Sequence, residues 1–315
     1  MSTNAENRIK GVLAPVVTPF NADLTINEQA FVEQCKWLIE NDVGLAVFGT
    51  NSEASSLSMP ERKKLLQLLI EAGIPKQRLM PGTGCCSIPE TVALTKHALA
   101  LGVNAVLMLP PFYYKSVSDD GIVQYFSKVI DDVGSDELRV YLYHFPATSQ
   151  VPISLRVVEK LLAKYPRVVA GIKDSSGDWE GTRSYISNFS AQGFDVFPGT
   201  EMLLRRAILE GGAGCISATA NVNPNALAAL YLECVAGGGE TADEDARRVR
   251  SVFQAYPLIA AMKRVIAGAR ANPNWSIVRP PLVSLSNSDY DRLGAQLLEA
   301  GFEGNELCAL PGVTA

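Results

Sequence analysis

Histidine is scarce in this sequence, and its scarcity excludes several kinds of site. The chain of 315 residues contains two histidines, His97 and His144, and no CxxC pair. A zinc or iron site built on several histidine or cysteine ligands is therefore not expected. Glycine-rich loops of the GxxxxGK or GxGxxG type are also missing, so a nucleotide cofactor has no support. The sequence predicts a site that uses neither a metal nor an organic cofactor.

Long hydrophobic runs and an excess of positive charge are missing as well. No segment approaches the roughly 20 apolar residues that a membrane span needs, and the stretch from Met1 to Lys10 is polar. The formal net charge is −5 at pH 7, which argues against nucleic acid or an anionic membrane as a partner. We therefore expect a cytoplasmic protein that acts on small molecules.

The cysteines do not have the spacing of a disulfide framework. Cys85 and Cys86 are adjacent, and the other four cysteines are scattered through the chain. In a chain of this length without an export signal, reduced thiols are the usual state. We expect Cys35, Cys215, Cys234 and Cys308 to be free thiols.

Short apolar runs alternate with longer segments of helical pattern over the first 223 residues. Such alternation predicts a parallel sheet built from strand–helix units. Eight candidate strands are present: Leu13–Val17, Leu45–Phe48, Leu79–Met80, Ala105–Leu109, Val140–Tyr143, Val168–Ile172, Val196–Phe197 and Cys215–Ile216.

Helix starts recur with a period of about 30 residues, the length of one strand–helix unit. Thr25, Ser58 and Ser87 each begin a capping box with a glutamate three residues later, and Ser118 continues the series. Eight such units predict a (β/α)₈ barrel of the TIM type, an α/β fold. An open doubly wound sheet is the alternative.

Beyond Asn223-Pro224 the strand pattern stops. Three helices are predicted there, over Asn225–Ala236, Ala242–Arg270 and Asp289–Ala300. We therefore divide the chain into a barrel over residues 1–223 and, over residues 224–315, a closing helix with a C-terminal helical extension.

Lys173 is the strongest candidate for chemistry. It ends the apolar run Val168–Ile172 and precedes the polar turn Asp174–Asp178. A lysine at the end of a buried strand is partly desolvated, and desolvation favours the neutral amine that attacks a ketone to form a Schiff base. The alternative is a loop lysine that points into solvent.

Polar and aromatic side chains also follow the other predicted strands, where a barrel has its active site. Each has a structural alternative: Tyr113 and Tyr114 could be core or interface aromatics, and Glu201 could complement a helix dipole after the cap Thr200. Together the strand ends offer a nucleophile, proton carriers and groups that bind a carboxylate.

Four motifs in the same order and spacing resemble the dihydrodipicolinate synthase / N-acetylneuraminate lyase family. The resemblance extends from about Lys10 to Asn223. It rests on the GTxxE turn (Gly49 to Glu53), the YxxP stretch (Tyr143 to Pro146), the GIKDSSGD stretch (Gly171 to Asp178) and the segment Ile216–Asn223.

The resemblance implies catalytic roles. Lys173 forms an imine with pyruvate or another 2-oxo acid, and Tyr143 is the general acid–base. Thr50 belongs to a proton relay that either Tyr113 or Tyr114 completes from a neighbouring subunit, with Tyr113 favoured. The family is typically a homotetramer, or dimer of dimers, and needs no cofactor besides the lysine imine.

The resemblance also implies residues that bind substrate. The Gly49–Asn51 turn grips the carboxylate of pyruvate through the backbone of Thr50 and Asn51, while Gly199 and Ile216 line the pocket. Ser175 and Glu201 occupy places where the sugar-acid lyases contact the substrate.

Three positions depart from the family pattern. Thr148 stands where the dihydrodipicolinate synthases have an arginine, and a threonine offers one neutral hydrogen bond in place of a charged clamp. Ser52 replaces a glycine and is strained if its φ is positive. His144 replaces an asparagine and is expected to be structural.

We therefore expect a class I aldolase or lyase, an enzyme that cleaves or forms a C–C bond between pyruvate and an aldehyde. The expected substrate is a 2-keto-3-deoxy sugar acid or a compound of the 4-hydroxy-2-oxoglutarate type. A dehydratase of deoxy sugar acids, dihydrodipicolinate synthase itself and a non-catalytic 2-oxo-acid binding protein remain alternatives.

Overall fold

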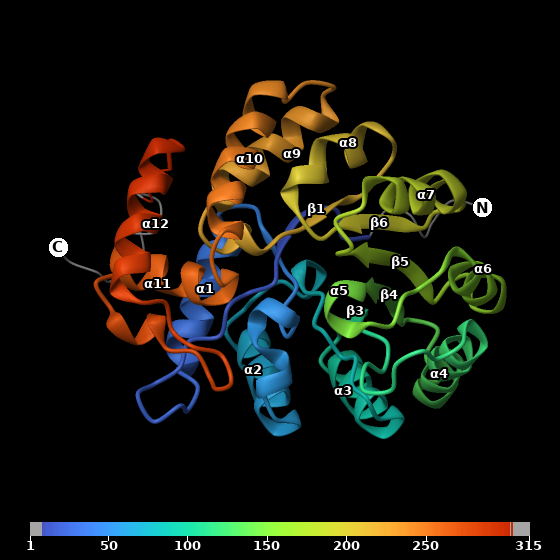
Figure 1. Ribbon diagram of the computed structural model, residues 1–315. Helices are drawn as coiled ribbons and strands as arrows, with labels where there is room; N and C mark the ends of the chain where they lie inside the picture. The colour runs from blue at the N-terminus through green and yellow to red at the C-terminus, as the bar shows by residue number, and fades with distance from the viewer. Residues whose placement is uncertain (1–7, 303, 305–315) are drawn as a thin grey trace.

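Seven parallel strands form two sheets in the computed structural model, which describes residues 8–302 and 304 (Figure 1). One sheet has the order β2-β1-β7 and the other the order β3-β4-β5-β6. The strands are β1 (Gly11–Ala14), β2 (Gly44–Leu45), β3 (Ala105–Met108), β4 (Arg139–His144), β5 (Val169–Asp174), β6 (Asp195–Pro198) and β7 (Gly214–Ile216).

The two sheets join at both edges, which closes the barrel. Between β2 and β3, Leu79 pairs with Leu45 and Gly82 pairs with Leu107 as isolated parallel bridges. Between β6 and β7, the Ala213 amide donates to the Val196 carbonyl at 3.0 Å. The predicted (β/α)₈ barrel is confirmed, and its third strand is reduced to two bridges.

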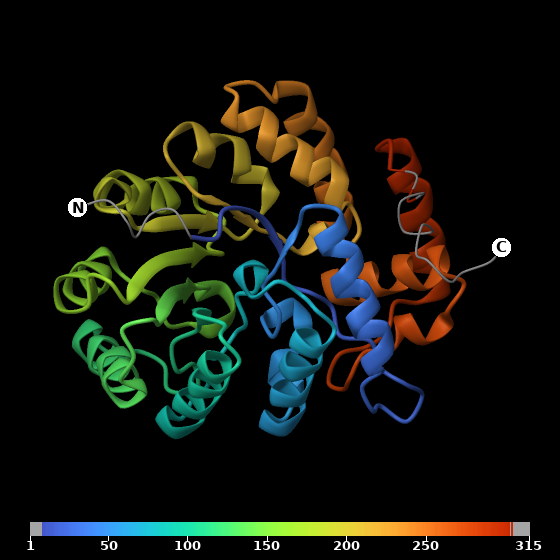
Figure 2. The same ribbon diagram turned by 180° about the vertical axis from the view of Figure 1, so that it is seen from behind.

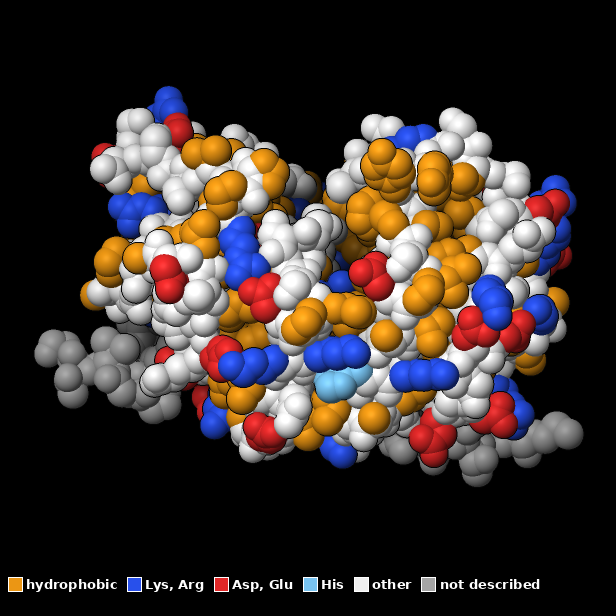
Figure 3. Space-filling view, turned by 90° about the horizontal axis from the view of Figure 1, so that it is seen from below, with side chains coloured by type: hydrophobic (Ala, Val, Ile, Leu, Met, Phe, Trp, Pro, Cys, Tyr) orange, Lys and Arg blue, Asp and Glu red, His pale blue; other side chains and the backbone are white. Residues whose placement is uncertain are grey.

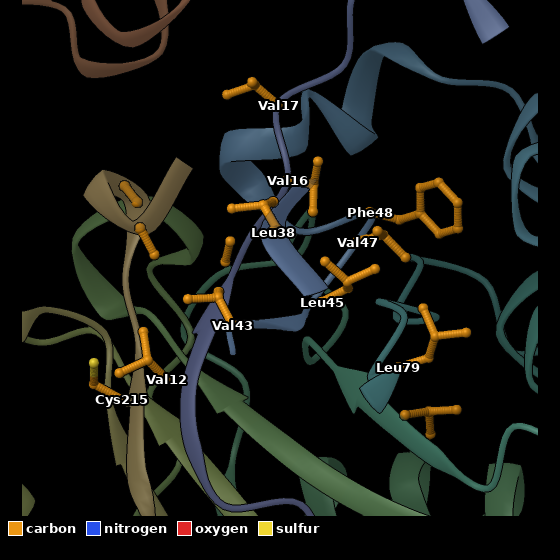
Figure 4. Packing of buried hydrophobic residues seen from close by; sticks show 14 of the residues in the cluster. Val12, Val16, Val17, Leu38, Val43, Leu45, Val47, Phe48, Leu79 and Cys215 are labelled. Atoms are coloured by element: carbon orange, nitrogen blue, oxygen red, sulfur yellow. The ribbon is translucent and has the colours of Figure 1, made fainter. Parts of the chain in front are cut away.

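The barrel interior is filled by side chains, as expected for a barrel of eight strands. Its buried residues come from strands around the whole circumference: Leu13, Ala46, Met80, Leu107, Tyr141, Tyr143, Ala170, Phe197 and Ile216. A second, larger cluster lies between the strands and the helices. Figure 4 shows part of it, where Leu38 of the first helix packs near Val43 and Leu45.

Helices surround the strands and alternate with them along the chain (Figure 1). They are α1 (Glu28–Glu40), α2 (Met59–Glu71), α3 (Ile88–Ala100), α4 (Asp119–Val133), α5 (Pro146–Ser149), α6 (Leu155–Lys164), α7 (Trp179–Phe189), α8 (Leu204–Leu209) and α9 (Pro224–Val235). Short 3₁₀ helices are η1 (Thr50–Ser52), η2 (Ala54–Ser56), η3 (Lys76–Arg78), η4 (Ser190–Gln192), η5 (Glu201–Leu203), η6 (Ala218–Asn221) and η7 (Pro273–Ser276).

The predicted helix caps are correct except for the first. Ser58 and Glu61 form a complete capping box, and the side chains of Ser87 and Ser118 accept hydrogen bonds from their helix N-termini. The prediction of a cap at Thr25 was wrong, because Asn27 caps α1. The Thr25 hydroxyl donates to Asp23 instead, at 2.6 Å.

The C-terminal segment holds α10 (Glu240–Gln254), α11 (Leu258–Ala269) and α12 (Asn287–Glu299). Figures 1 and 2 show α11 and α12 at one side of the barrel and α10 beside α9. The prediction of one helix over residues 242–270 was wrong. Pro257 precedes α11, and a proline lacks the amide that would continue α10.

The surface charges are mixed, and the cysteines described in the structure are free thiols. Lys and Arg side chains are interspersed with Asp and Glu on the face shown in Figure 3. Within the described residues, no helix is long and apolar enough to cross a membrane. Cys35, Cys215 and Cys234 are buried free thiols, and burial raises the pKa of Cys35 and Cys215. Cys308 lies outside the described residues.

Candidate active site

A cavity of about 500 Å³ opens at the carboxyl ends of the strands. Its lower wall comes from the strand ends and its upper wall from α10, α11 and the segment around Leu282. Seven of the candidate residues line it: Lys173, Tyr143, Thr50, Asn51, Ser175, Gly199 and Thr148. The C-terminal helices therefore complete a pocket that the barrel alone would leave open.

Lys173 lies next to Tyr143 because the two residues are register partners on β5 and β4. The lysine is 2% exposed. Its Nζ lies 4.3 Å from the centre of the Tyr143 ring. Among the described residues, Nζ has neither a hydrogen bond nor an ion pair. The amine is thus enclosed in protein but free to react with a ligand in the cavity.

Tyr143 connects Lys173 to the turn after β2. Its hydroxyl lies 3.3 Å from the Thr50 hydroxyl, and its ring stacks on Phe145 with 5.8 Å between the ring centres. These contacts hold the phenol beside the amine, so a proton can pass between Tyr143, Thr50 and a bound molecule.

The turn that carries Thr50 has an unusual backbone. Phe48 and Glu53, on either side of η1, have φ values of 62° and 57°. Ser52 does not have a positive φ and so escapes the strain considered for it: it is the last residue of η1, and Glu53 adopts the left-handed conformation. The Ser52 hydroxyl is buried and has no hydrogen-bond partner within the described residues.

Asp174, the residue after the lysine, fixes the loop that follows β5. Its buried carboxylate accepts hydrogen bonds from the Ser176 amide at 2.9 Å and the Thr182 hydroxyl at 2.6 Å. Its carbonyl accepts from the Gly199 amide. A Cβ at position 199 would collide with the Ser175 hydroxyl, so glycine is required there. This network positions the end of β5, and Lys173 with it.

His144 has a structural role. Its Nδ1 accepts a hydrogen bond from the Ile153 amide at 2.9 Å, and its ring packs against Tyr185. Burial lowers the pKa of His144, although Asp174 opposes the shift. A neutral ring that accepts at Nδ1 fits this position.

The remaining candidates lie outside the cavity of about 500 Å³. Gly49 lines an adjoining cavity of about 550 Å³, which shares Thr50 and Tyr143 as a common wall. Ile216 is buried in the barrel interior. Tyr113 and Tyr114 are each 74% exposed and line neither cavity.

Glu201 lies beside the cavity that Lys173 lines and is buried. It is 1% exposed and is absent from the cavity wall. Its two carboxylate oxygens accept hydrogen bonds from the hydroxyls of Ser217 and Thr219. The Nη1 atom of Arg250 is 3.8 Å from its Oε2.

The upper wall of the cavity was not predicted from the sequence. Arg250 and Gln254 of α10, and Leu282 beyond α11, line the pocket although no motif marks them. One signal was available: Arg250 lies on the buried stripe of α10 together with Ala246, Val249 and Phe253. An arginine on such a stripe needs either a partner or a ligand.

Within the part of the chain that the structure describes, no group of three or more His, Cys, Asp or Glu residues could hold a metal ion.

Comparison with known proteins identifies the family. Residues 8–300 match the model of the dihydrodipicolinate synthetase family. The chain belongs to this family. Its members are lyases, so the protein is an enzyme that acts as a carbon–carbon lyase.

Two named relatives cover most of the chain. A protein described as an uncharacterized DapA-like lyase from Chloroflexus aurantiacus is 32% identical over 290 residues, which are 91% of this chain and 95% of the relative. A 4-hydroxy-tetrahydrodipicolinate synthase from Bartonella bacilliformis is 30% identical over 298 residues, 93% of this chain and 98% of the relative.

Solved structures of family members superpose closely on the barrel and its tail. Dihydrodipicolinate synthase from Agrobacterium tumefaciens has a TM-score of 0.85 at 29% identity, covering 93% of this chain and 99% of that chain. YagE from E. coli K12, solved in complex with pyruvate, has a TM-score of 0.85 at 26% identity, with the same two coverages. The family fold thus includes the C-terminal helices.

Proposed function

We propose that this lyase is a class I aldolase that joins pyruvate to an aldehyde, or cleaves the product, through an imine on Lys173. The observation that carries the proposal is the environment of the amine. Lys173 is enclosed beside the Tyr143 ring, its Nζ has no hydrogen bond or ion pair within the described residues, and it lines the cavity at the strand ends. A lysine with this geometry can act as a nucleophile towards a ketone.

In the cleavage direction, the proposed reaction begins when Nζ adds to C2 of the 2-oxo acid and water leaves. Tyr143 then takes the proton of the C4 hydroxyl, and its hydrogen bond to Thr50 supports the transfer. The C3–C4 electron pair moves into the protonated imine, which becomes an enamine as the aldehyde departs. Protonation at C3 and hydrolysis release pyruvate and the free lysine.

The residues of the turn after β2 are suited to hold the carboxylate of pyruvate. Asn51 and Thr50 line the cavity in the first turn of η1, where free backbone amides attract an anion. The proposed chemistry uses no metal and no organic cofactor. Pyruvate is the ligand in the YagE structure, which supports it as the ketone partner of this chain.

We further propose that the active form is a homotetramer in which Tyr113 of one subunit completes the relay of another. Tyr113 and Tyr114 stand exposed on the surface, with their rings 5.4 Å apart. Replacing each tyrosine by phenylalanine tests the assignment. Tyr113→Phe is expected to lower kcat while Tyr114→Phe does not, and equal kcat values in both variants would contradict it.

Borohydride trapping tests the imine. The protein is incubated with pyruvate, reduced, and weighed intact by mass spectrometry, with Lys173→Ala as the control. We expect the wild type to gain one reduced pyruvyl group and to lose activity, while the variant stays unmodified. An unmodified wild type at saturating pyruvate would overturn the proposal.

Dihydrodipicolinate synthase activity is the second candidate, because the Bartonella relative carries that name. Thr148 lines the cavity mouth and cannot provide the charged clamp of those enzymes. Condensation of pyruvate with aspartate semialdehyde would favour this candidate. Loss of water from a deoxy sugar acid without release of pyruvate would instead indicate a dehydratase.

A further inference from the structure

We infer that Arg250 binds a carboxylate on the aldehyde half of the substrate, so that the preferred substrate carries an anionic group at each end. This inference rests on the proposed aldolase reaction and specifies which aldehydes it uses. It concerns a residue on α10, far in sequence from every motif of the barrel.

The charged side chains of the cavity wall favour an anionic ligand. Of the residues that line it, two have charged side chains, Lys173 and Arg250, and neither an aspartate nor a glutamate is among them. The Lys173 end belongs to the ketone, whose carboxylate lies next to the imine. Arg250 provides a second positive charge that the ketone does not require.

The guanidinium of Arg250 has no hydrogen-bond partner among the described residues. The residue is 6% exposed. Its Nε and Nη1 are fully enclosed and unpartnered, and Nη2 likewise makes no hydrogen bond to any described residue. A buried cation without hydrogen bonds is unfavourable in the empty protein, and Nη2, the guanidinium nitrogen that is not fully enclosed, can donate to a ligand carboxylate.

Glu201 lies next to Arg250 and is occupied by other donors. Both oxygens of this carboxylate already accept hydrogen bonds from Ser217 and Thr219. At 3.8 Å, Glu201 attracts the guanidinium of Arg250 without forming a hydrogen bond to it. The carboxylate therefore helps to hold the buried arginine in place, while Nη2 stays available to a ligand.

Arg250 is held firmly at the cavity wall. One turn earlier on α10, Arg247 pairs with Asp243 at 2.9 Å and donates to the Met202 carbonyl at 2.6 Å, which fixes α10 against η5. One turn later, Gln254 also lines the cavity. The same face of α10 thus presents a cation and an amide to the substrate, as expected for residues four apart.

A carboxylate fits this site better than a hydroxyl. A planar carboxylate matches the two-donor edge of a guanidinium, whereas a sugar hydroxyl would satisfy one donor and leave the charge unpaired. Of the substrate types expected from the sequence, the 4-hydroxy-2-oxoglutarate type carries such a group and the neutral-tailed deoxy sugar acids do not.

The test measures condensation of pyruvate with paired aldehydes in the purified wild-type enzyme. Glyoxylate is compared with glycolaldehyde, and succinic semialdehyde with 4-hydroxybutanal, because each pair differs by a carboxylate against a hydroxymethyl group. We expect kcat/KM to favour the carboxylate by at least about 30-fold, or about 2 kcal/mol, in one of the two pairs. The two pairs differ in the length of chain between the carbonyl and the carboxylate. The pair that shows the preference therefore indicates how far the second carboxylate lies from Lys173.

Variants assign the preference to Arg250. Arg250→Gln is expected to lose the preference while retaining turnover of the neutral aldehyde and pyruvate trapping, and Arg250→Lys is expected to retain part of it. Arg248→Gln is the matched control, because Arg248 lies on the same helix in an exposed pair with Asp245. The control is expected to behave like the wild type.

The outcomes separate the two proposals. If pyruvate trapping fails in the wild type, the aldolase proposal falls. If trapping succeeds and the wild type does not prefer the carboxylate in either pair, the role of Arg250 is wrong and the aldolase stands. A preference for the carboxylate that survives in Arg250→Gln would also overturn the role of Arg250. Should Arg250→Gln not fold, Arg250→Lys must show a reduced preference.

Discussion

Two lysines are buried in this protein, and their surroundings differ. Lys173 is 2% exposed and Lys263 is 0% exposed. Each amine lies over an aromatic ring, Lys173 at 4.3 Å from Tyr143 and Lys263 at 4.4 Å from Phe20. Burial and an aromatic neighbour therefore do not distinguish a reactive lysine from a structural one.

The difference lies in the partners. Lys263 Nζ donates to Glu53 Oε1 and to the Thr18 carbonyl, both at 2.7 Å. Glu53 Oε2 accepts from the backbone amide of Arg279 at 2.9 Å. We call these four residues the Lys263 joint. It connects the turns after β1 and β2 with α11 and the segment beyond it, so these hydrogen bonds hold the C-terminal helices against the barrel.

Electrostatics at the joint follow from burial. Burial lowers the pKa of Lys263 to about 8, and the charge of Glu53 opposes that shift. Lys173, by contrast, faces a cavity without any acidic side chain in its wall. The comparison indicates that a buried amine is available for chemistry when the described residues give it no hydrogen bond or ion pair.

Replacing Lys173 by alanine should give the largest effect on activity. We expect turnover to fall by about 1,000-fold or more, since no other amine lines the cavity. The free energy of unfolding should change by less than about 1 kcal/mol, because no hydrogen bond or ion pair to a described residue is lost. Steady-state kinetics and urea denaturation measure the two quantities. A large loss of stability would contradict the prediction that Lys173 contributes little to the stability of the fold.

Replacing Lys263 by methionine should give the opposite result. The unfolding free energy is expected to fall by about 3–5 kcal/mol, because Glu53 would be left as an unpaired buried charge. Folded molecules should retain pyruvate trapping. The double variant Lys263→Met/Glu53→Gln removes the stranded charge and should recover part of the loss. A Lys263→Met protein as stable as the wild type would refute a fastening role.

The acid sensitivity of Glu61 provides a smaller effect next to the joint. Arg279 donates to both oxygens of Glu61, at 2.5 Å and 3.1 Å, and lowers its pKa from 4.5 to about 2. Because the folded value lies below the unfolded one, the stabilisation is complete above pH 4.5 and is lost as the pH falls towards 2. After allowance for partial exposure, it amounts to about 1–2 kcal/mol.

The Glu61→Gln variant should therefore lose less stability than the wild type between pH 4.5 and 2 in denaturation curves. Glu90→Gln is the matched control, because Glu90 holds the same capping position in α3 and has no ion pair within the described residues. Equal acid slopes for Glu61→Gln and the wild type would show that Arg279 does not fasten α2 to the tail.

Most of the fold could be predicted because the strand–helix period and the serine caps are local signals. Ser58, Ser87 and Ser118 cap helices where the pattern placed them. The break at Pro257 was missed because the residues on both sides favour a helix. A full third strand was predicted at Leu79–Met80, but only isolated bridges form there, because one bridge on each side suffices to close the barrel.

The lower half of the site could also be predicted, since Lys173, Tyr143 and Thr50 follow strands that end at one face. Its upper half could not. Arg250 and Leu282 reach the cavity through the packing of the tail on the barrel, which leaves no motif. The same applies to Lys263 and Glu53, which are 210 residues apart and meet only in the folded chain.

Peptide mapping after borohydride reduction tests the central claim most directly. The wild-type enzyme is reduced in the presence of pyruvate and digested, and the peptides containing Lys173 and Lys263 are compared by mass spectrometry. The account predicts a reduced pyruvyl group on Lys173 and an unmodified Lys263. A label on Lys263, or none on Lys173 at saturating pyruvate, would contradict it.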